Sequence, residues 1–237
     1  MNRTMAHATG VPAPSGPTPR ERAAPHERPA FRDRAARPAP GVLDLRGRPA
    51  RCPDTLRFGP RDIVVVTGLP GSGKSTLMRR AVTARRLDSQ DTRARFAARL
   101  PRPLPYALYR PLARAAHYWA LRRALRAEQG LVVHDCGTQP WVRRWLARAA
   151  RRSGATLHLL LLDVPAEAAR AGQYRRGRTV SRRAFERHRR TTARLLGALR
   201  RGEMPAGCGS AVLLDRAAAD AVQRIVFTEY GSVTGTR

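Results

Sequence analysis

Residues 68–75 constrain this chain more than any other stretch, because they spell Gly-Leu-Pro-Gly-Ser-Gly-Lys-Ser. The stretch matches G-x-x-x-x-G-K-[ST], in which glycines let the backbone turn tightly and aim N–H groups at phosphate oxygens. A β-branched run at 63–67 precedes it and predicts a buried parallel strand. Residues 76–82 predict a helix whose N-terminus adds its positive dipole end. We therefore expect a strand–loop–helix unit that binds phosphate.

The pattern also assigns roles within this unit. Lys74 is expected to reach the β- and γ-phosphates of ATP, and the Ser75 hydroxyl to ligate Mg²⁺. Lys74 is the only lysine among 46 lysine and arginine residues. Because a planar guanidinium is a poor substitute for a compact ammonium, this single lysine favours a working site. The expected nucleotide-binding residues are Gly68, Leu69, Pro70, Gly71, Ser72, Gly73, Lys74, Ser75 and Thr76.

The charge of the chain favours anionic partners. Its formal net charge is +29, and residues 61–237 hold 35 basic and 12 acidic residues, so the excess lies in the part expected to fold. A field of this sign attracts nucleotides, phosphorylated substrates or nucleic acid, although a compositional drift towards arginine gives the same count. Three cysteines without metal-type spacing indicate a reduced, cytoplasmic protein. No apolar run reaches membrane-spanning length, and no signal-peptide core is seen.

Alternating strand and helix patterns predict the fold class. Residues 1–50 are rich in Pro, Ala and Arg and predict a disordered basic tail. Residues 55–230 predict one α/β domain with a five-stranded, mostly parallel sheet and helices on both faces. Strands are expected at 55–58, 63–67, 131–135, 156–163 and 211–215, and helices at 76–82, 92–100, 106–129, 139–152, 165–171, 181–201 and 217–226.

A short acidic stretch follows the first helix. Six extended residues from Thr83 can bring the chain back to the phosphate end, which places Asp88 or Asp91 near the reaction. A carboxylate there could take the proton of an acceptor hydroxyl while Arg93 steadies the phosphoryl group. The alternative is that Ser89 or Asp91 only caps the helix at 92–100.

Two further groups complete the predicted site. Asp135 ends a predicted strand and is expected to hold Mg²⁺ through water, whereas its neighbours His134 and Cys136 are interpreted as packing residues. A loop after the fourth main strand is dense in arginine and predicts a lid that closes over the transferred phosphate, unless it is merely a solvated basic loop. The lid arginines are Arg175, Arg176 and Arg178.

These residues together resemble the phosphate-loop kinases of the AAA-type ATP-binding family that includes relatives of polynucleotide kinase and adenylylsulfate kinase. The resemblance spans about Asp62 to Phe227 and includes the phosphate loop, the acidic stretch at 87–93 and the arginine lid. In those kinases the aspartate usually lies three residues before the arginine, and here that place is Gln90, so Asp88 and Asp91 both stay candidates. The resemblance implies ATP, Mg²⁺ and γ-phosphate transfer.

Two functions fit the sequence. The first is an ATP- and Mg²⁺-dependent kinase that phosphorylates a hydroxyl of a small metabolite or a nucleic-acid 5′ end. The second is an ATP-binding switch or ATPase whose nucleotide state controls a partner. The acidic stretch and the lid arginines favour the kinase, because a switch usually needs a γ-phosphate sensor and a surface that reorders.

Overall fold

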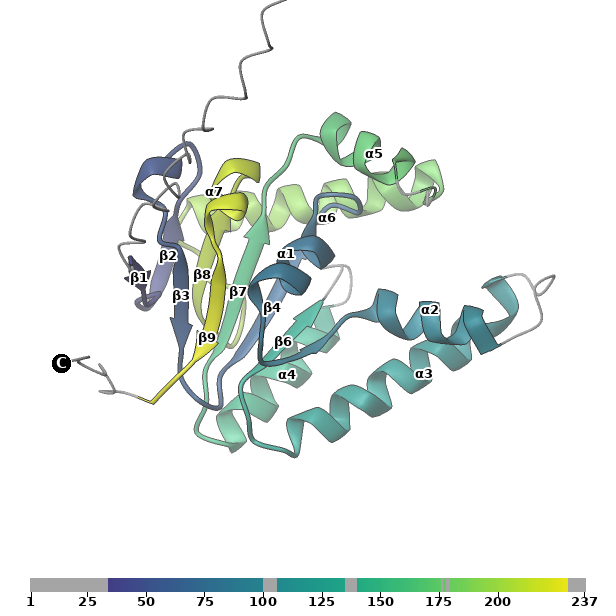
Figure 1. The fold of residues 1–237 in the computed structure, drawn as a ribbon, viewed down its shortest axis with the longest axis horizontal. Helices are drawn as coiled ribbons and strands as arrows, with labels where there is room; N and C mark the ends of the chain where they lie inside the picture. The colour runs from purple at the N-terminus through teal and green to yellow at the C-terminus, as the bar shows by residue number, and fades with distance from the viewer. Residues whose placement is uncertain (1–33, 100–105, 135–139, 176, 178–179, 230–237) are drawn as a thin grey trace, which may run out of the picture. The chain divides into compact units, whose positions relative to one another are not determined.

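The computed structural model describes residues 34–99, 106–134, 140–175, 177 and 180–229 (Figure 1), and all of these belong to the compact unit Asp33–Arg237. The strands are β1 (Ala35–Ala36), β2 (Gly41–Asp44), β3 (Thr55–Phe58), β4 (Ile63–Gly68), β5 (Arg85–Leu87), β6 (Leu131–His134), β7 (Leu157–Leu162), β8 (Cys208–Leu214) and β9 (Arg224–Phe227). The helices are η1 (Pro49–Arg51), α1 (Lys74–Ala81), α2 (Ser89–Arg99), α3 (Tyr106–Leu125), α4 (Pro140–Arg152), α5 (Ala166–Tyr174), α6 (Arg182–Arg200) and α7 (Arg216–Ala221).

The main sheet has six strands in the order β2-β8-β7-β4-β6-β5, and every neighbouring pair is parallel. The predicted α/β fold with a parallel sheet is confirmed, but the strand count of five is too low. The expected edge strand at 55–58 is β3, which pairs with β1 and β9 in a separate three-stranded sheet. The last predicted helix ends early at Ala221, and 224–227 form β9 instead.

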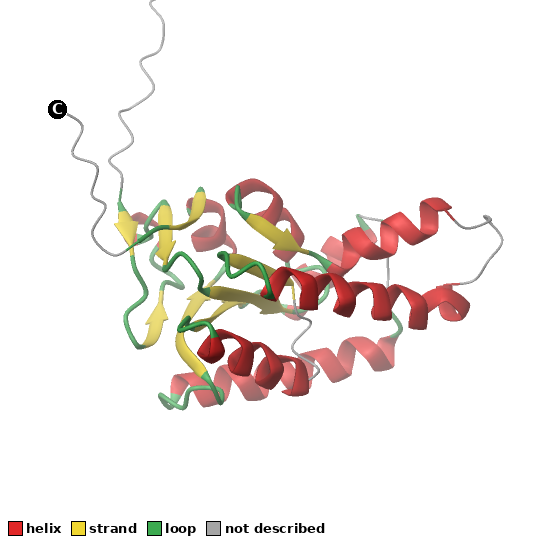
Figure 2. Ribbon diagram, turned by 90° about the horizontal axis from the view of Figure 1, so that it is seen from below, coloured by secondary structure: helices red, strands yellow, loops and turns green. Residues whose placement is uncertain are grey.

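Helices cover both faces of the main sheet because its strands alternate their side chains between two cores (Figures 1 and 2). Val64 and Val66 of β4 pack in one core with side chains of α1 and α7. Ile63 and Val65 pack in the other core with side chains of α3, α4 and α6. Strands buried on both sides account for the continuous apolar runs in the sequence.

The order of the strands determines where a ligand can bind. β4 lies between β6 and β7, so the chain moves to one side of β4 for β5 and β6 and to the other side for β7 and β8. In an open parallel sheet, ligands bind beyond the carboxyl ends of the strands at such a switch point. The glycine-rich loop follows β4 directly and therefore lies at this point.

The predicted disordered tail at 1–50 is wrong for its last part, whereas residues 1–33 lie outside the described residues. β2 pairs with β8 along the edge of the main sheet. Arg46 donates to Asp163, and the Gly47 N–H donates to Asp215 at 2.7 Å. A strand of four residues in a Pro- and Arg-rich stretch has too weak a pattern to be seen, and its pairing with β8 is what orders it.

A buried polar cluster closes the opposite, amino-terminal end of the sheet. His158 of β7 contacts the Asp62 carboxylate at 2.9 Å and the Ser210 hydroxyl at 2.8 Å. Asp62 also accepts the N–H groups of Gly59 and Thr156, at 2.6 and 2.8 Å. Burial would raise the pKa of Asp62, but these hydrogen bonds lower it below its ordinary value.

In the described part of the chain, no helix combines the length and the apolar character that crossing a membrane requires.

Shortening the amino terminus tests the role of β2. Removing residues 1–50 is expected to lower Tm by about 5–10 °C, because it deletes β2 and the contacts of Arg46 and Gly47. Removing residues 1–33 is expected to leave both Tm and ATP affinity near those of the full chain. Thermal unfolding of both shortened proteins provides the comparison, and equal Tm values would show that β2 contributes little.

Asp62→Asn tests the buried cluster. We expect it to lower the free energy of unfolding at pH 7 by about 3 kcal/mol, because it disrupts a buried, hydrogen-bonded charge. A lowered pKa stabilises the fold above the ordinary aspartate pKa and loses this effect as pH falls through the folded value, so the difference should shrink below about pH 4. Urea unfolding across pH measures this. Asp220→Asn, at an exposed ion pair with Arg80, is the near-neutral control.

Candidate functional site

The loop after β4 has the backbone of a phosphate-binding turn. Gly71 and Gly73 adopt φ angles of +88° and +105°, which other residues rarely tolerate. A Cβ at Gly71 would lie 2.1 Å from the Ala169 carbonyl oxygen, so only glycine lets the loop approach α5 this closely. The loop then enters α1 at Lys74, where the first N–H groups of a helix point to a bound anion.

Lys74 is held inside this loop. Its side chain is 5% exposed, and its ammonium donates to the carbonyl oxygens of Gly68 and Leu69 at 2.9 and 2.7 Å. Leu69 anchors the loop by packing with Ala169 and Phe185. The ammonium is therefore already positioned among the backbone groups that face the cleft.

The loop forms one wall of a cleft of about 410 Å³. Helices α1, α2, α5 and α6 and the carboxyl end of β6 contribute the other walls. Four basic side chains from three helices therefore face the same space, together with a histidine at the end of β6. The described lining residues are Gly68, Pro70, Gly71, Gly73, Lys74, Ser75, Arg79, Gln90, Arg93, His134, Gln173, Gly177, Val180 and His188.

Asp88 lies at the joint between β5 and α2 and is 5% exposed. One carboxylate oxygen accepts the Gln90 N–H at 2.8 Å and contacts Nδ1 of His134 at 2.8 Å, and the Ser75 hydroxyl also bonds the carboxylate. Burial on its own would raise the pKa of Asp88, but His134 and these other donors hold it well below its usual range. The carboxylate therefore stays ionised beside the predicted phosphate and Mg²⁺ site.

The structure reassigns the helix cap that the sequence left open. The Asp88 carbonyl accepts the N–H groups of Asp91 and Thr92, and its side chain accepts that of Gln90, so Asp88 caps α2 in place of Ser89 or Asp91. Asp91 lies half-buried in the first turn. The two readings of Asp88, cap and reacting-site carboxylate, therefore do not exclude each other.

The interpretation of His134 as a packing residue is incomplete. Its ring joins Asp88 across the ends of β5 and β6, lies 3.2 Å from the Ser89 hydroxyl, and lines the cleft. Sequence reasoning missed this contact because the two partners lie 46 positions apart. The signal that could have found it is a polar residue at the carboxyl end of a buried strand, at the edge where such sheets bind ligands.

The remaining predicted residues are distributed unevenly. Arg93 lines the cleft, and Thr76 is exposed on α1. Arg175 is exposed at the end of α5, where the predicted lid begins. Asp135, Arg176 and Arg178 lie outside the described residues.

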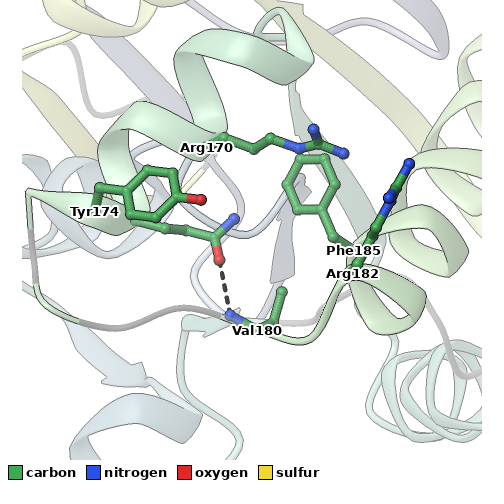
Figure 3. A pocket seen from close by; sticks show the side chains of 6 residues that line it. Arg170, Tyr174, Val180, Arg182 and Phe185 are labelled. Carbon is green, nitrogen blue, oxygen red and sulfur yellow. Dashed lines mark hydrogen bonds between the residues drawn. The ribbon is translucent and has the colours of Figure 1, made fainter.

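A second, smaller hollow of about 270 Å³ lies beside the base of the predicted lid (Figure 3). In it the Arg170 guanidinium lies over the Phe185 ring, with 4.8 Å between them. The Gln173 side chain donates to the Pro70 carbonyl at 3.1 Å and accepts the Val180 N–H at 3.0 Å. Gln173 thus connects the phosphate loop directly to the residue where the lid segment rejoins the fold.

Arg216 is a further residue that the sequence did not single out. It is the first residue of α7, which Asp215 caps. A Cβ built at Gly73 would lie 3.1 Å from its guanidinium, so this cation is next to the phosphate loop. It follows β8 at the carboxyl edge of the sheet, the same edge that carries Asp88 and His134.

Comparisons with known proteins agree with this geometry. A structure from the PezAT chromosomal toxin–antitoxin system of Streptococcus pneumoniae is 15% identical, with a TM-score of 0.51, and the match covers 74% of this chain and 81% of that one. A tunicamycin resistance protein of Deinococcus radiodurans is 16% identical, with a TM-score of 0.36, over 68% of this chain and 91% of the other. A search of curated proteins gave no match.

The family itself is shown by a sequence model described as an AAA domain, which matches residues 63–200. This range covers more than half of the chain, beginning at the first residue of β4 and ending at the last residue of α6. It contains the phosphate loop, Asp88, His134 and Gln173. The chain therefore belongs to this AAA domain family and is a phosphate-loop, kinase-like protein.

Proposed function

We propose that the protein is an ATP-dependent phosphotransferase that moves the γ-phosphate of ATP to a hydroxyl group. The observation that carries this proposal is the ionised Asp88 carboxylate, held against Ser75 at the wall of the cleft that contains Lys74. A phosphate-binding loop alone fits any nucleotide-binding protein. A buried carboxylate fixed beside it supplies what transfer to a hydroxyl needs, which is a group that orients the hydroxyl and draws off its proton.

The site fits Mg²⁺. The Ser75 hydroxyl and the Asp88 carboxylate are neighbouring oxygen donors, and Mg²⁺ prefers such hard ligands with water completing its shell. Ser75 is proposed as the direct ligand and Asp135 as a further one. When bound, the ion would neutralise charge on the phosphates.

The chain's own residues divide the other tasks. Lys74 binds the β- and γ-phosphates, and Arg79, Arg93 and His188 add positive charge around the same cleft. The lid residues Arg175, Arg176 and Arg178 are proposed to close over the transferred group and exclude water. Gln173 supports this movement by joining the lid's end at Val180 to Pro70 of the loop.

Measuring ATP consumption with and without candidate acceptors distinguishes a kinase from a nucleotide switch. The acceptor panel contains hydroxylated metabolites and oligonucleotides with a free 5′-hydroxyl. A kinase consumes ATP faster with one member and yields a phosphorylated product. ATP binding without any stimulation across the panel would favour the switch.

Lys74→Arg is expected to lower ATP affinity and turnover at least tenfold, although the charge is kept. The guanidinium is too broad for the space where the ammonium donates to two loop carbonyls. Isothermal titration with ATP and a turnover assay measure both quantities. Arg148→Lys, at an exposed position on α4, is the matched control and should behave as the parent. Parent-like turnover in Lys74→Arg would show that the loop is not a working phosphate site.

Asp88→Asn should reduce phosphoryl transfer by about 10²–10⁴ while ATP affinity stays within about threefold. The asparagine oxygen can still accept the Gln90 N–H and cap α2, so the change mainly removes the charge. Asp91→Asn is the paired variant and should retain most of the rate, because Asp91 lies in the first turn without lining the described cleft. The opposite pattern, with Asp91→Asn the slow variant, would move the role to Asp91.

A further inference from the structure

His134 carries a buried nitrogen that the proposed function has not used. The side chain is 6% exposed, and its Nε2 has no hydrogen-bond partner among the described residues. A buried polar atom without a partner is costly, so its position calls for a ligand group, water or ion. His134 is also one of the residues that line the cleft.

The Asp88 contact determines which ring nitrogen is the acceptor. An ionised carboxylate can only accept, so Nδ1 of His134 must donate to Asp88 across their 2.8 Å contact. In the neutral ring this leaves the lone pair on Nε2. The carboxylate therefore fixes the tautomer and the orientation of a ring whose acceptor atom is unoccupied by protein.

A second aspartate–histidine pair in the same sheet serves as an internal comparison. His158 contacts Asp62 through Nε2 and Ser210 through Nδ1, so both of its nitrogens have protein partners. That pair lies at the amino-terminal end of the strands, away from the phosphate loop. The pair at the carboxyl end differs by leaving one nitrogen unpartnered at the wall of a cleft, which a purely structural pair has no need to do.

Asp88 itself is poorly placed to take a proton from a substrate. Its carboxylate already accepts from the Gln90 N–H, His134 and Ser75, and it is nearly fully buried. His134 lines the cleft, whereas Asp88 is not among its described lining residues. A hydroxyl in the cleft would therefore meet Nε2 of His134 rather than an oxygen of Asp88.

We propose that His134 is the catalytic residue that contacts the acceptor hydroxyl through Nε2, and that Asp88 acts as its positioning residue. This proposal rests on the proposed phosphotransferase function. In the transfer step the hydroxyl O–H bond breaks and its proton goes to Nε2, while the oxygen forms a bond to the γ-phosphorus. The bond from that phosphorus to the β–γ bridging oxygen breaks, and its electron pair leaves with ADP.

Two substitutions separate the roles of the two ring nitrogens. His134→Asn keeps a donor where Nδ1 meets Asp88 but has nothing at the Nε2 position. His134→Gln can place an amide oxygen near the Nε2 position but loses the Nδ1 donor. The assay uses γ-labelled ATP with Mg²⁺ alone, so that water is the hydroxyl, and ATP affinity is measured separately.

If Nε2 contacts the hydroxyl, the rate of ATP hydrolysis should fall in the order parent, His134→Gln, His134→Asn. His134→Asn should lose at least tenfold in kcat with ATP affinity within about threefold. Adding free imidazole to His134→Gly should restore part of the rate, which also covers the case in which an amide variant folds poorly. His117→Asn removes a neighbouring buried imidazole on α3 that is not among the described cleft residues, and should keep the parent rate.

The opposite order, with His134→Asn faster than His134→Gln, would show that His134 only positions Asp88 and would overturn this inference alone. An unchanged rate in His134→Asn would do the same. A parent protein that fails to bind or consume ATP would overturn the proposed function, and this inference with it.

Discussion

The Asp88 carboxylate is the interaction on which the arrangement of the cleft depends. It follows β5, caps α2 through Gln90, bonds the first turn of α1 through Ser75 and contacts β6 through His134. Four elements that are distant in sequence thus meet at one buried charge. Such a charge is tolerated because every element supplies it with a hydrogen bond, and removing one donor would leave the others poorly compensated.

A second constraint joins the phosphate loop to the predicted lid. Gly71 and Gly172 approach so closely that a Cβ on Gly172 would lie 2.5 Å from the Gly71 carbonyl oxygen. Gln173, the next residue, bonds both Pro70 and Val180. Because the loop is fixed against α5 on one side and α1 begins on the other, a change in the loop on nucleotide binding has a direct route to the lid segment through Gln173.

How much the sequence could predict follows from the range of each interaction. The phosphate loop and the strands around it were predictable because their signals are local: glycines at fixed spacing and apolar runs of strand length. The Asp88–His134 pair and strand β2 were not, because each depends on pairing with residues far along the chain. Asp88 was identified as a candidate from the reach of the chain, whereas its capping role required the observed N–H contacts.

The arrangement of charge around the cleft explains why a chain this basic can retain such a site. Lys74 and Arg79 come from α1, Arg93 from α2 and His188 from α6, so separate elements bring like charges towards one space. Asp88 offsets part of this field but is largely engaged by its own donors. A bound triphosphate would complete the compensation and draw these helices to a common anion. Nucleotide binding and closure of the cleft are therefore expected to be one electrostatically coupled event, in which α2 and α6 approach the loop together.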